Sequence, residues 1–301
     1  MIICGVAATL ITGLTGVANN LSEYTMYSLS ELIFLVPTLI LLIIDRFDVL
    51  RGIRLKFIGI RTILWTILFT ILVLPVMGLL NILSQFLVSN VATASLVETA
   101  TMPWWINLIY IAVLPGIVEE FLFRGVLFHA MRPCSLFKSA VITGILFGLM
   151  HLNFNQFLYA TALGILFAYL VEASGSLFSS MLSHTLINTL PVLLMQVANR
   201  LYPEDLVRAA AQMHQDAAGD APASVVELVI MAAIAIVGLI LAAIVLKQIA
   251  KTNGREKLYS DALRGKDRIK GKEGRVFSIE LVIGALIAIV MIGTLMILGM
   301  R

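Results

Sequence analysis

Two adjacent acids, Glu119 and Glu120, stand inside an apolar stretch of this 301-residue chain, and Arg124 follows them. A charged side chain at membrane depth costs roughly 2.5 kcal/mol or more, so such residues usually mark a functional site. In a helix, Glu120 and Arg124 lie one turn apart on the same face and can neutralise each other. Glu119 points about 100° away and has Phe123, not a cation, four residues later. The spacing predicts an ion-paired clamp and, in Glu119, a reactive carboxylate.

An unpaired carboxylate in an apolar setting is a competent general base near neutral pH. Pro115 lies four residues before Glu119 and has no N–H. The carbonyl of Ile111 therefore loses its helical donor, and we expect the helix to kink there. A kink beside the carboxylate would make room for water. The alternative is that both acids are structural or line an ion path.

Two further polar signals follow on later apolar stretches. His151 ends one of them, after Gly144 and Gly148, whose spacing favours tight packing of another helix. His184 and Asn188 are four residues apart and share one helical face, from which both could donate hydrogen bonds to a developing oxyanion. Taken singly, each residue is better explained by helix packing or an interhelical hydrogen bond. Their joint occurrence with Glu119 favours hydrolysis by an activated water.

The composition indicates a membrane protein. Hydrophobic residues make up 60% of the chain, charged residues 13%, and the mean hydropathy is +0.99, whereas a soluble domain carries about 25% charged residues. The apolar runs have the length of membrane-spanning helices, and the alternation of a β-barrel is absent. We therefore expect an all-α, polytopic membrane helical bundle with eight to nine transmembrane helices. The predicted spans lie near residues 2–18, 27–44, 62–83, 104–131, 137–152, 156–173, 177–198, 225–247 and 279–300.

Basic residues predict the orientation. Most of the 21 Lys and Arg lie in the loops 45–61, 132–138 and 247–275, which alternate to the same side of the membrane. The positive-inside rule makes that side cytoplasmic. Nine spans with the N-terminus inside fit this pattern, and so do eight with the N-terminus outside if 2–18 does not cross.

The motifs divide the chain into a working part and its surroundings. We expect residues 1–103 to form N-terminal scaffold helices and residues 104–198 to form a catalytic membrane core carrying all the polar signals. Residues 199–224 are predicted to be a polar extracytoplasmic loop. Residues 225–301 are predicted to hold two C-terminal spans joined by a basic cytoplasmic loop, 248–275, of the kind attracted to anionic lipid.

Three motifs, in order and on separate apolar helices, resemble those of the CPBP family, also called the Abi family, which includes the type II CAAX prenyl proteases. They are Glu119-Glu120-x-x-x-Arg124, Phe147-x-x-x-His151 and His184-x-x-x-Asn188. The resemblance covers roughly residues 104–192, about a third of the chain.

The resemblance implies an intramembrane glutamic endopeptidase, a CAAX-type peptide hydrolase. By position, Glu119 and His151 would activate the water, and His184 and Asn188 would form the oxyanion hole. The family's mechanism implies no metal and no cofactor. By residue type alone, a zinc site with Glu119, His151 and His184 as ligands stays open.

The resemblance also bears on partners and location. Eukaryotic relatives remove the last three residues of prenylated proteins, and prokaryotic relatives are linked to peptide maturation, bacteriocin self-immunity and membrane-protein processing. We expect a membrane-associated protein or peptide as substrate, the lipid bilayer as surroundings, and no nucleic acid. Basic loops without an organelle signal favour a prokaryotic plasma membrane.

Two other function classes fit the same residues. A proton- or ion-coupled transporter could use Glu119, His151 and His184 as a relay, although no internal repeat is evident. A catalytically silent membrane protein that binds peptides is the third reading, and the intact motif set argues against it.

Overall fold

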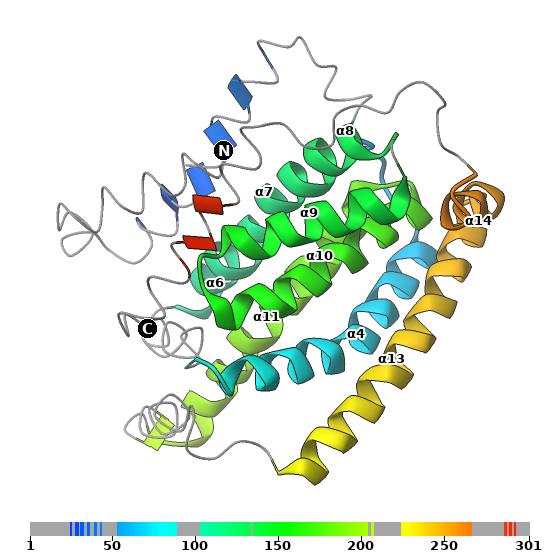
Figure 1. Ribbon diagram of the computed structural model, residues 1–301. Coiled ribbons are helices and arrows are strands. Elements are labelled where there is room, and N and C mark those ends of the chain that lie inside the picture. Colours follow the sequence, from blue (N-terminus) through cyan, green and yellow to red (C-terminus); the bar gives the residue numbers. More distant parts are fainter. Residues whose placement is uncertain are drawn as a thin grey trace.

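The structure of the protein is a computed structural model. Every regular element among the described residues is a helix, which confirms the all-α prediction (Figure 1). The described residues are 25, 28–29, 31–32, 35–36, 39–40, 43, 53–88, 103–133, 135–203, 206–207, 224–266, 286–287, 289–290 and 292. The elements are α4 (Ile60–Gln85), α6 (Trp104–Asn107), η2 (Leu108–Val113), α7 (Leu114–Glu120), η3 (Phe121–Phe128), α8 (His129–Met131), α9 (Leu136–Met150), α10 (Phe154–Ser174), α11 (Leu177–Leu201), α13 (Val225–Thr252) and α14 (Glu256–Leu263).

Five helices among the described residues are long and apolar enough to cross a membrane, which makes this a multi-pass membrane protein. They are Ile60–Gln85, Trp104–Met131, Phe154–Ser174, Leu177–Leu201 and Val225–Thr252. The shorter apolar helix α9 matches a sixth predicted span. The predicted segment 2–18 and most of 27–44 and 279–300 lie outside the described residues, so the count of eight to nine stays a prediction, as does the division into domains.

Short polar residues fix where the central helices begin and end. The Ser135 side chain accepts a hydrogen bond from the Lys138 N–H (3.1 Å) at the start of α9, and Ser176 accepts one from the Phe178 N–H (3.2 Å) at the start of α11. Each satisfies a backbone donor that the first helical turn leaves without a partner. Gly175 ends α10 in the left-handed conformation (φ 71°), which glycine adopts without steric cost.

Glycines bring α9 and α10 into close contact. A Cβ atom added to Gly144 would lie 2.9 Å from the carbonyl oxygen of Thr161, and one added to Gly148 would lie 2.7 Å from that of Phe157. A Cβ on Gly164 of α10 would in turn lie 2.7 Å from the Cα of Gly144. The tight packing predicted from the glycine spacing is therefore confirmed.

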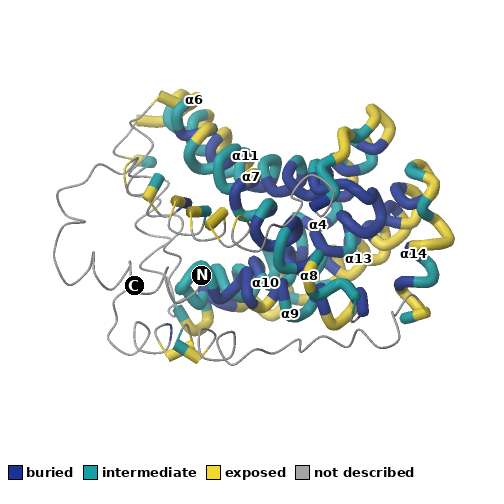
Figure 2. Tube along the Cα trace, turned by 90° about the horizontal axis from the view of Figure 1, so that it is seen from above, coloured by how far each residue is buried: buried dark blue, intermediate teal, exposed yellow. Residues whose placement is uncertain are grey.

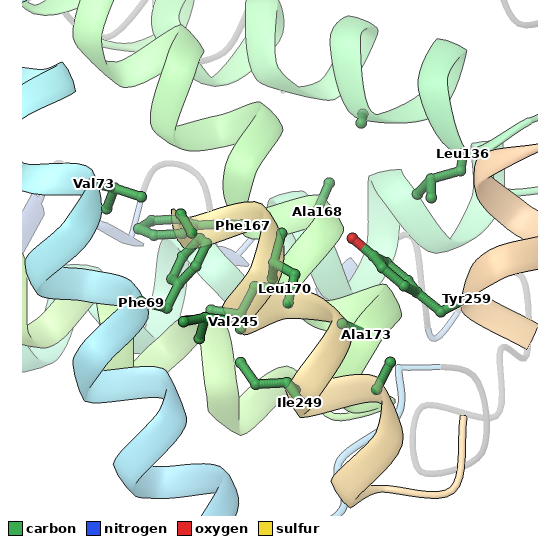
Figure 3. Close-up of a cluster of buried hydrophobic side chains, with 14 of the residues drawn as sticks. Phe69, Val73, Leu136, Phe167, Ala168, Leu170, Ala173, Val245, Ile249 and Tyr259 are labelled. Atoms are coloured by element: carbon green, nitrogen blue, oxygen red, sulfur yellow. The ribbon is translucent and has the colours of Figure 1, made fainter. Parts of the chain in front are cut away.

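One apolar core joins α4, α10 and α13, with Phe69, Phe167 and Ile249 completely buried in it (Figure 3). The transmembrane window of α10 is 56% buried, whereas that of α13 is 22% buried. Figure 2 accordingly shows much of α13 as exposed. In a membrane protein such apolar exposed surface faces lipid, so α10 is a central helix and α13 a peripheral one.

The three basic loops meet at one end of the bundle, where their arginines converge on Glu172 near the end of α10. The Glu172 carboxylate lies 3.1 Å from Arg54, 2.9 Å from Arg132 and 3.2 Å from Arg255. Burial, and then the neighbouring Arg54, lower the pKa of Arg255, and Glu172 opposes that shift. The prediction that loops 45–61, 132–138 and 247–275 lie on one side is confirmed for these residues.

Replacing Gly148 with alanine should lower the thermal unfolding midpoint of the purified protein. Helix propensity alone would favour alanine by about 1 kcal/mol, but overpacking against the Phe157 carbonyl costs about 1–3 kcal/mol. The matched control is Gly59→Ala, since nothing lies within 4 Å of a Cβ added there. Equal midpoints for the two variants would contradict the close α9–α10 contact.

Glu172→Gln should destabilise the protein by about 1–3 kcal/mol, because it removes the negative charge on which three arginines converge. The measurement is thermal or denaturant unfolding in detergent micelles. Glu256→Gln, an exposed glutamate at the start of α14, is the control and should change little. An effect of Glu172→Gln no larger than that of Glu256→Gln would show that the cluster does not stabilise the fold.

Candidate active site

Two π-helical segments flank the acidic pair. η2 ends at Val113, just before Pro115, and η3 begins at Phe121, just after Glu120. Single π-helical turns inside an α-helix are rare and frequently occur at functional sites. The sequence did not predict these π-helical segments, and the kink expected at Pro115 stays a prediction.

The predicted ion pair between Glu120 and Arg124 is confirmed. Arg124 Nη1 donates to Glu120 Oε1 over 2.7 Å, and both side chains are completely buried. The guanidinium carbon of Arg124 also lies 4.3 Å from the centroid of the Phe147 ring and 5.3 Å from that of Phe167. These cation–π contacts help to hold the charge away from water.

His184 of α11 extends this buried pair into a triad. Its Nδ1 lies 3.1 Å from Glu120 Oε1, the same oxygen that accepts from Arg124. Because an ionised carboxylate only accepts, Nδ1 must carry the hydrogen. The other ring nitrogen, Nε2, is then directed at Glu119 Oε2, 4.0 Å away. Local spacing does not predict this second partner of Glu120, because the two residues are 64 positions apart in the chain.

Glu119 is placed differently from its neighbour. Its side chain is 14% exposed, and its buried Oε2 has no hydrogen-bond partner among the described residues. Buried polar atoms in folded proteins are nearly always paired, and an exception calls for an explanation such as a catalytic role. Glu120 Oε2 also has no hydrogen-bond partner there, but Glu120 is fully buried and bonded through Oε1. Glu119, which is partly exposed, is therefore the carboxylate of the site best placed to engage a further molecule.

Phe147 lies between the two motif histidines. The Nδ1 of His151 donates to the Phe147 carbonyl (2.9 Å), and the His151 ring meets the Phe147 ring edge-to-face at 5.2 Å. The His184 ring also meets Phe147 edge-to-face, at 5.7 Å. Within the part of the chain that the structure describes, no hydrogen bond joins His151 to Glu119. The structure thus brings His184 to the acidic pair and keeps His151 across the Phe147 ring.

Close packing of α7 against α11 sets the distance between Glu119 and His184. A Cβ atom added to Gly116 would collide with the Thr185 hydroxyl and lie 3.1 Å from the Thr185 backbone nitrogen. Only glycine lets the helix bearing Glu119 approach this closely. Asn188 lies one turn beyond His184 on the same helix, α11, as their four-residue spacing predicted. Its side chain is half-buried.

One acid near the site was missed by the sequence analysis. Glu31 is buried, 9% exposed, and interacts electrostatically with Glu119. It comes from the predicted span 27–44, far from the three motifs. An isolated glutamate in an apolar stretch was the available signal, and no spacing connected it with Glu119.

The described residues do not form the zinc site that the residue types left open. No group of three or more His, Cys, Asp or Glu side chains there is arranged to hold a metal ion. Of the three ligands considered, Glu119 and His184 face each other, and His151 is held by the Phe147 carbonyl.

Comparison with known proteins points to the same segment. Residues 101–190 match the family model described as type II CAAX prenyl endopeptidase Rce1-like. A stretch of 94 residues is 28% identical to a Bacillus subtilis (strain 168) protein described as "Putative membrane peptidase YdiL". That match covers 31% of this chain and 38% of the relative, so it spans well under half of either protein. No solved structure matches the chain.

The comparison confirms the resemblance to the type II CAAX prenyl endopeptidases for residues 101–190. This segment contains all seven named residues of the three motifs, from Glu119 to Asn188. It also contains Gly116, against which α11 packs closely. The N-terminal part of the chain, with Glu31, lies outside the match.

Glu120→Gln should lower stability by about 3–5 kcal/mol, because it leaves Arg124 buried without its counter-charge. Arg124→Ala should also destabilise, through the orphaned carboxylate. The informative control is the double variant Glu120→Gln with Arg124→Met, which removes both charges and should recover part of the loss. Unfolding of all variants in the same detergent measures this, and additive losses in the double variant would contradict a coupled pair.

Proposed function

We propose that this protein is an intramembrane endopeptidase, of the glutamic CAAX-type class, that hydrolyses peptide bonds of membrane-associated proteins or peptides. The observation that carries the proposal is the buried, unpartnered carboxylate oxygen of Glu119, facing His184 Nε2 across 4.0 Å. The family match over residues 101–190 supports the same reaction class. The proposal requires no metal and no cofactor.

In the proposed reaction Glu119 acts first as general base. It takes a proton from a water molecule, whose oxygen attacks the carbonyl carbon of the scissile peptide bond. The carbonyl oxygen becomes the oxyanion of a tetrahedral intermediate. Glu119 then returns the proton to the leaving nitrogen as the carbon–nitrogen bond breaks, which leaves an amine and a carboxylic acid that afterwards loses its own proton to solvent. His151 is assigned to hold the water, through the ring nitrogen that its bond to Phe147 leaves available.

The oxyanion is assigned to His184 and Asn188. Because Nδ1 of His184 donates to Glu120, its Nε2 can donate to an oxyanion only when the ring is protonated on both nitrogens. Glu120 is therefore more than a partner of Arg124 in this proposal, since it also fixes the orientation of the His184 ring.

The surroundings of the reaction follow from the fold. The site lies within membrane-spanning helices, so we propose substrates that reach it from the bilayer or its surface. The basic loops favour placement in a prokaryotic plasma membrane with the Glu172 end in the cytoplasm. We propose residues 104–198 as the catalytic core and the flanking helices as its scaffold.

Glu119→Gln should reduce cleavage by about 10²–10⁴-fold, because glutamine cannot accept the proton of the water. We would compare the termini of all membrane proteins between cells carrying wild type and cells carrying the variant at equal expression. Termini found with wild type and lost with Glu119→Gln are the expected result. They would also identify the substrates.

The control is Glu256→Gln, the same chemical change at an exposed position, which should give the wild-type pattern of termini. Identical termini in wild type and Glu119→Gln would contradict the peptidase proposal. Measurement of pH-dependent ion flux would then test the carrier reading.

A further inference from the structure

The arginine cluster at the basic end of the bundle holds more positive charge than its carboxylate can neutralise. Glu172, whose side chain is 4% exposed, is the carboxylate on which the guanidinium groups of Arg54, Arg132 and Arg255 converge. An arginine in a protein keeps its charge at neutral pH. Three guanidinium groups around one carboxylate leave an excess of two positive charges. The side chains of Arg54 and Arg255 are 25% and 22% exposed, so a ligand can reach them from outside the bundle.

The surrounding loops do not supply the missing negative charge. Among the described residues of the loops 45–61, 132–138 and 247–275, the acids are Glu256 and Asp261 of α14. The described cations of these loops outside the cluster are Lys56, Arg61, Lys138, Lys247, Lys251, Lys257, Arg264 and Lys266. An anionic partner from outside this part of the chain is therefore favoured at the cluster.

Backbone contacts hold two of the arginines in place. The carbonyl oxygen of Arg54 accepts a hydrogen bond from the Leu177 N–H (3.1 Å) at the start of α11. The Nε of Arg255 donates to the carbonyl oxygen of Glu172 over 3.0 Å. Its side chain packs over Gly175, where an added Cβ atom would lie 2.7 Å from the Arg255 Cδ. A ligand would meet guanidinium groups that are already ordered, which lowers the entropy cost of binding.

Exposed apolar side chains stand beside these arginines. Phe57, three residues after Arg54, is 93% exposed and stacks on the ring of Phe178, with the centroids 5.0 Å apart. Leu258 of α14, three residues after Arg255, is exposed as well. Cationic and apolar side chains together are typical of a surface at the membrane interface. A phospholipid would satisfy both kinds of group, whereas a free anion would use only the arginines.

We propose that Arg54, Arg132 and Arg255 together bind the phosphate group of one anionic phospholipid, whose acyl chains lie over the neighbouring exposed apolar residues. The planar guanidinium group suits this role, because it donates two parallel hydrogen bonds to phosphate oxygens.

This is a single site and not the general attraction of basic loops to anionic lipid. Its arginines come from the loop before α4, the loop after α8 and the turn between α13 and α14. One bound headgroup would therefore link the flanking helices to the segment that carries the candidate active site. The inference is independent of the proposed peptidase activity.

The test counts lipids on the full-length protein by native mass spectrometry in an uncharged detergent, during a titration with phosphatidylglycerol. We expect binding to saturate first at one lipid per chain. Phosphatidylcholine with the same acyl chains carries a phosphate but no net charge, and it should bind at least about tenfold more weakly. Inorganic phosphate at equal concentration should leave the bound lipid in place, because it lacks acyl chains. Equal binding of the two lipids, or displacement by phosphate, would overturn the proposal.

Two matched variants separate the site from diffuse attraction. Arg54→Gln should weaken phosphatidylglycerol binding by about tenfold. Lys251→Gln removes the same charge from an exposed position at the end of α13 and should change binding by less than about twofold. Equal losses in the two variants would reject a defined site. Arg255→Gln tests the same site from another loop if Arg54→Gln folds poorly, and unchanged binding in Arg255→Gln would likewise reject it.

Discussion

The buried ion pair of Glu120 and Arg124 is the constraint on which the site depends. Both side chains are fully enclosed, at 2.7 Å from each other, in a bundle whose interior is otherwise mainly apolar. Neither charge could remain there alone, because an isolated ion in such a medium is strongly disfavoured. The pair therefore fixes the local helix, and its shared oxygen also orients His184. Among the described residues, Glu119 is left as the carboxylate of the site without a comparable bond.

Close backbone contacts then place this charge group against its neighbours. Gly116 lets α7 approach α11 at Thr185, and Gly144 and Gly148 let α9 approach α10. The Phe147 ring fills the space between the guanidinium and the two imidazoles. Without a hydrophobic force between helices in lipid, such close packing is what holds a membrane bundle together. The stability of the bundle and the geometry of the candidate site thus rest on the same few contacts.

The basic end of the bundle has the opposite excess of charge from the candidate active site. There one carboxylate, Glu172, gathers three arginines from three loops, and the excess positive charge remains partly accessible. In the candidate active site, carboxylates outnumber the one arginine. A positive excess at this end suits a membrane surface, where anionic headgroups supply counter-charge. The negative excess has no such source of counter-charge within the bilayer.

The sequence alone determined the class of structure and the local pairs. Apolar runs of spanning length require a helical membrane bundle, and four-residue spacing placed Glu120 with Arg124 and His184 with Asn188, because the period of the α-helix is fixed. Tertiary structure decided the rest. The bond from His184 to Glu120 joins two helices that are distant in the sequence, and their rotation and depth depend on packing. The π-helical segments beside the acids depend on it as well, since local propensity does not encode them.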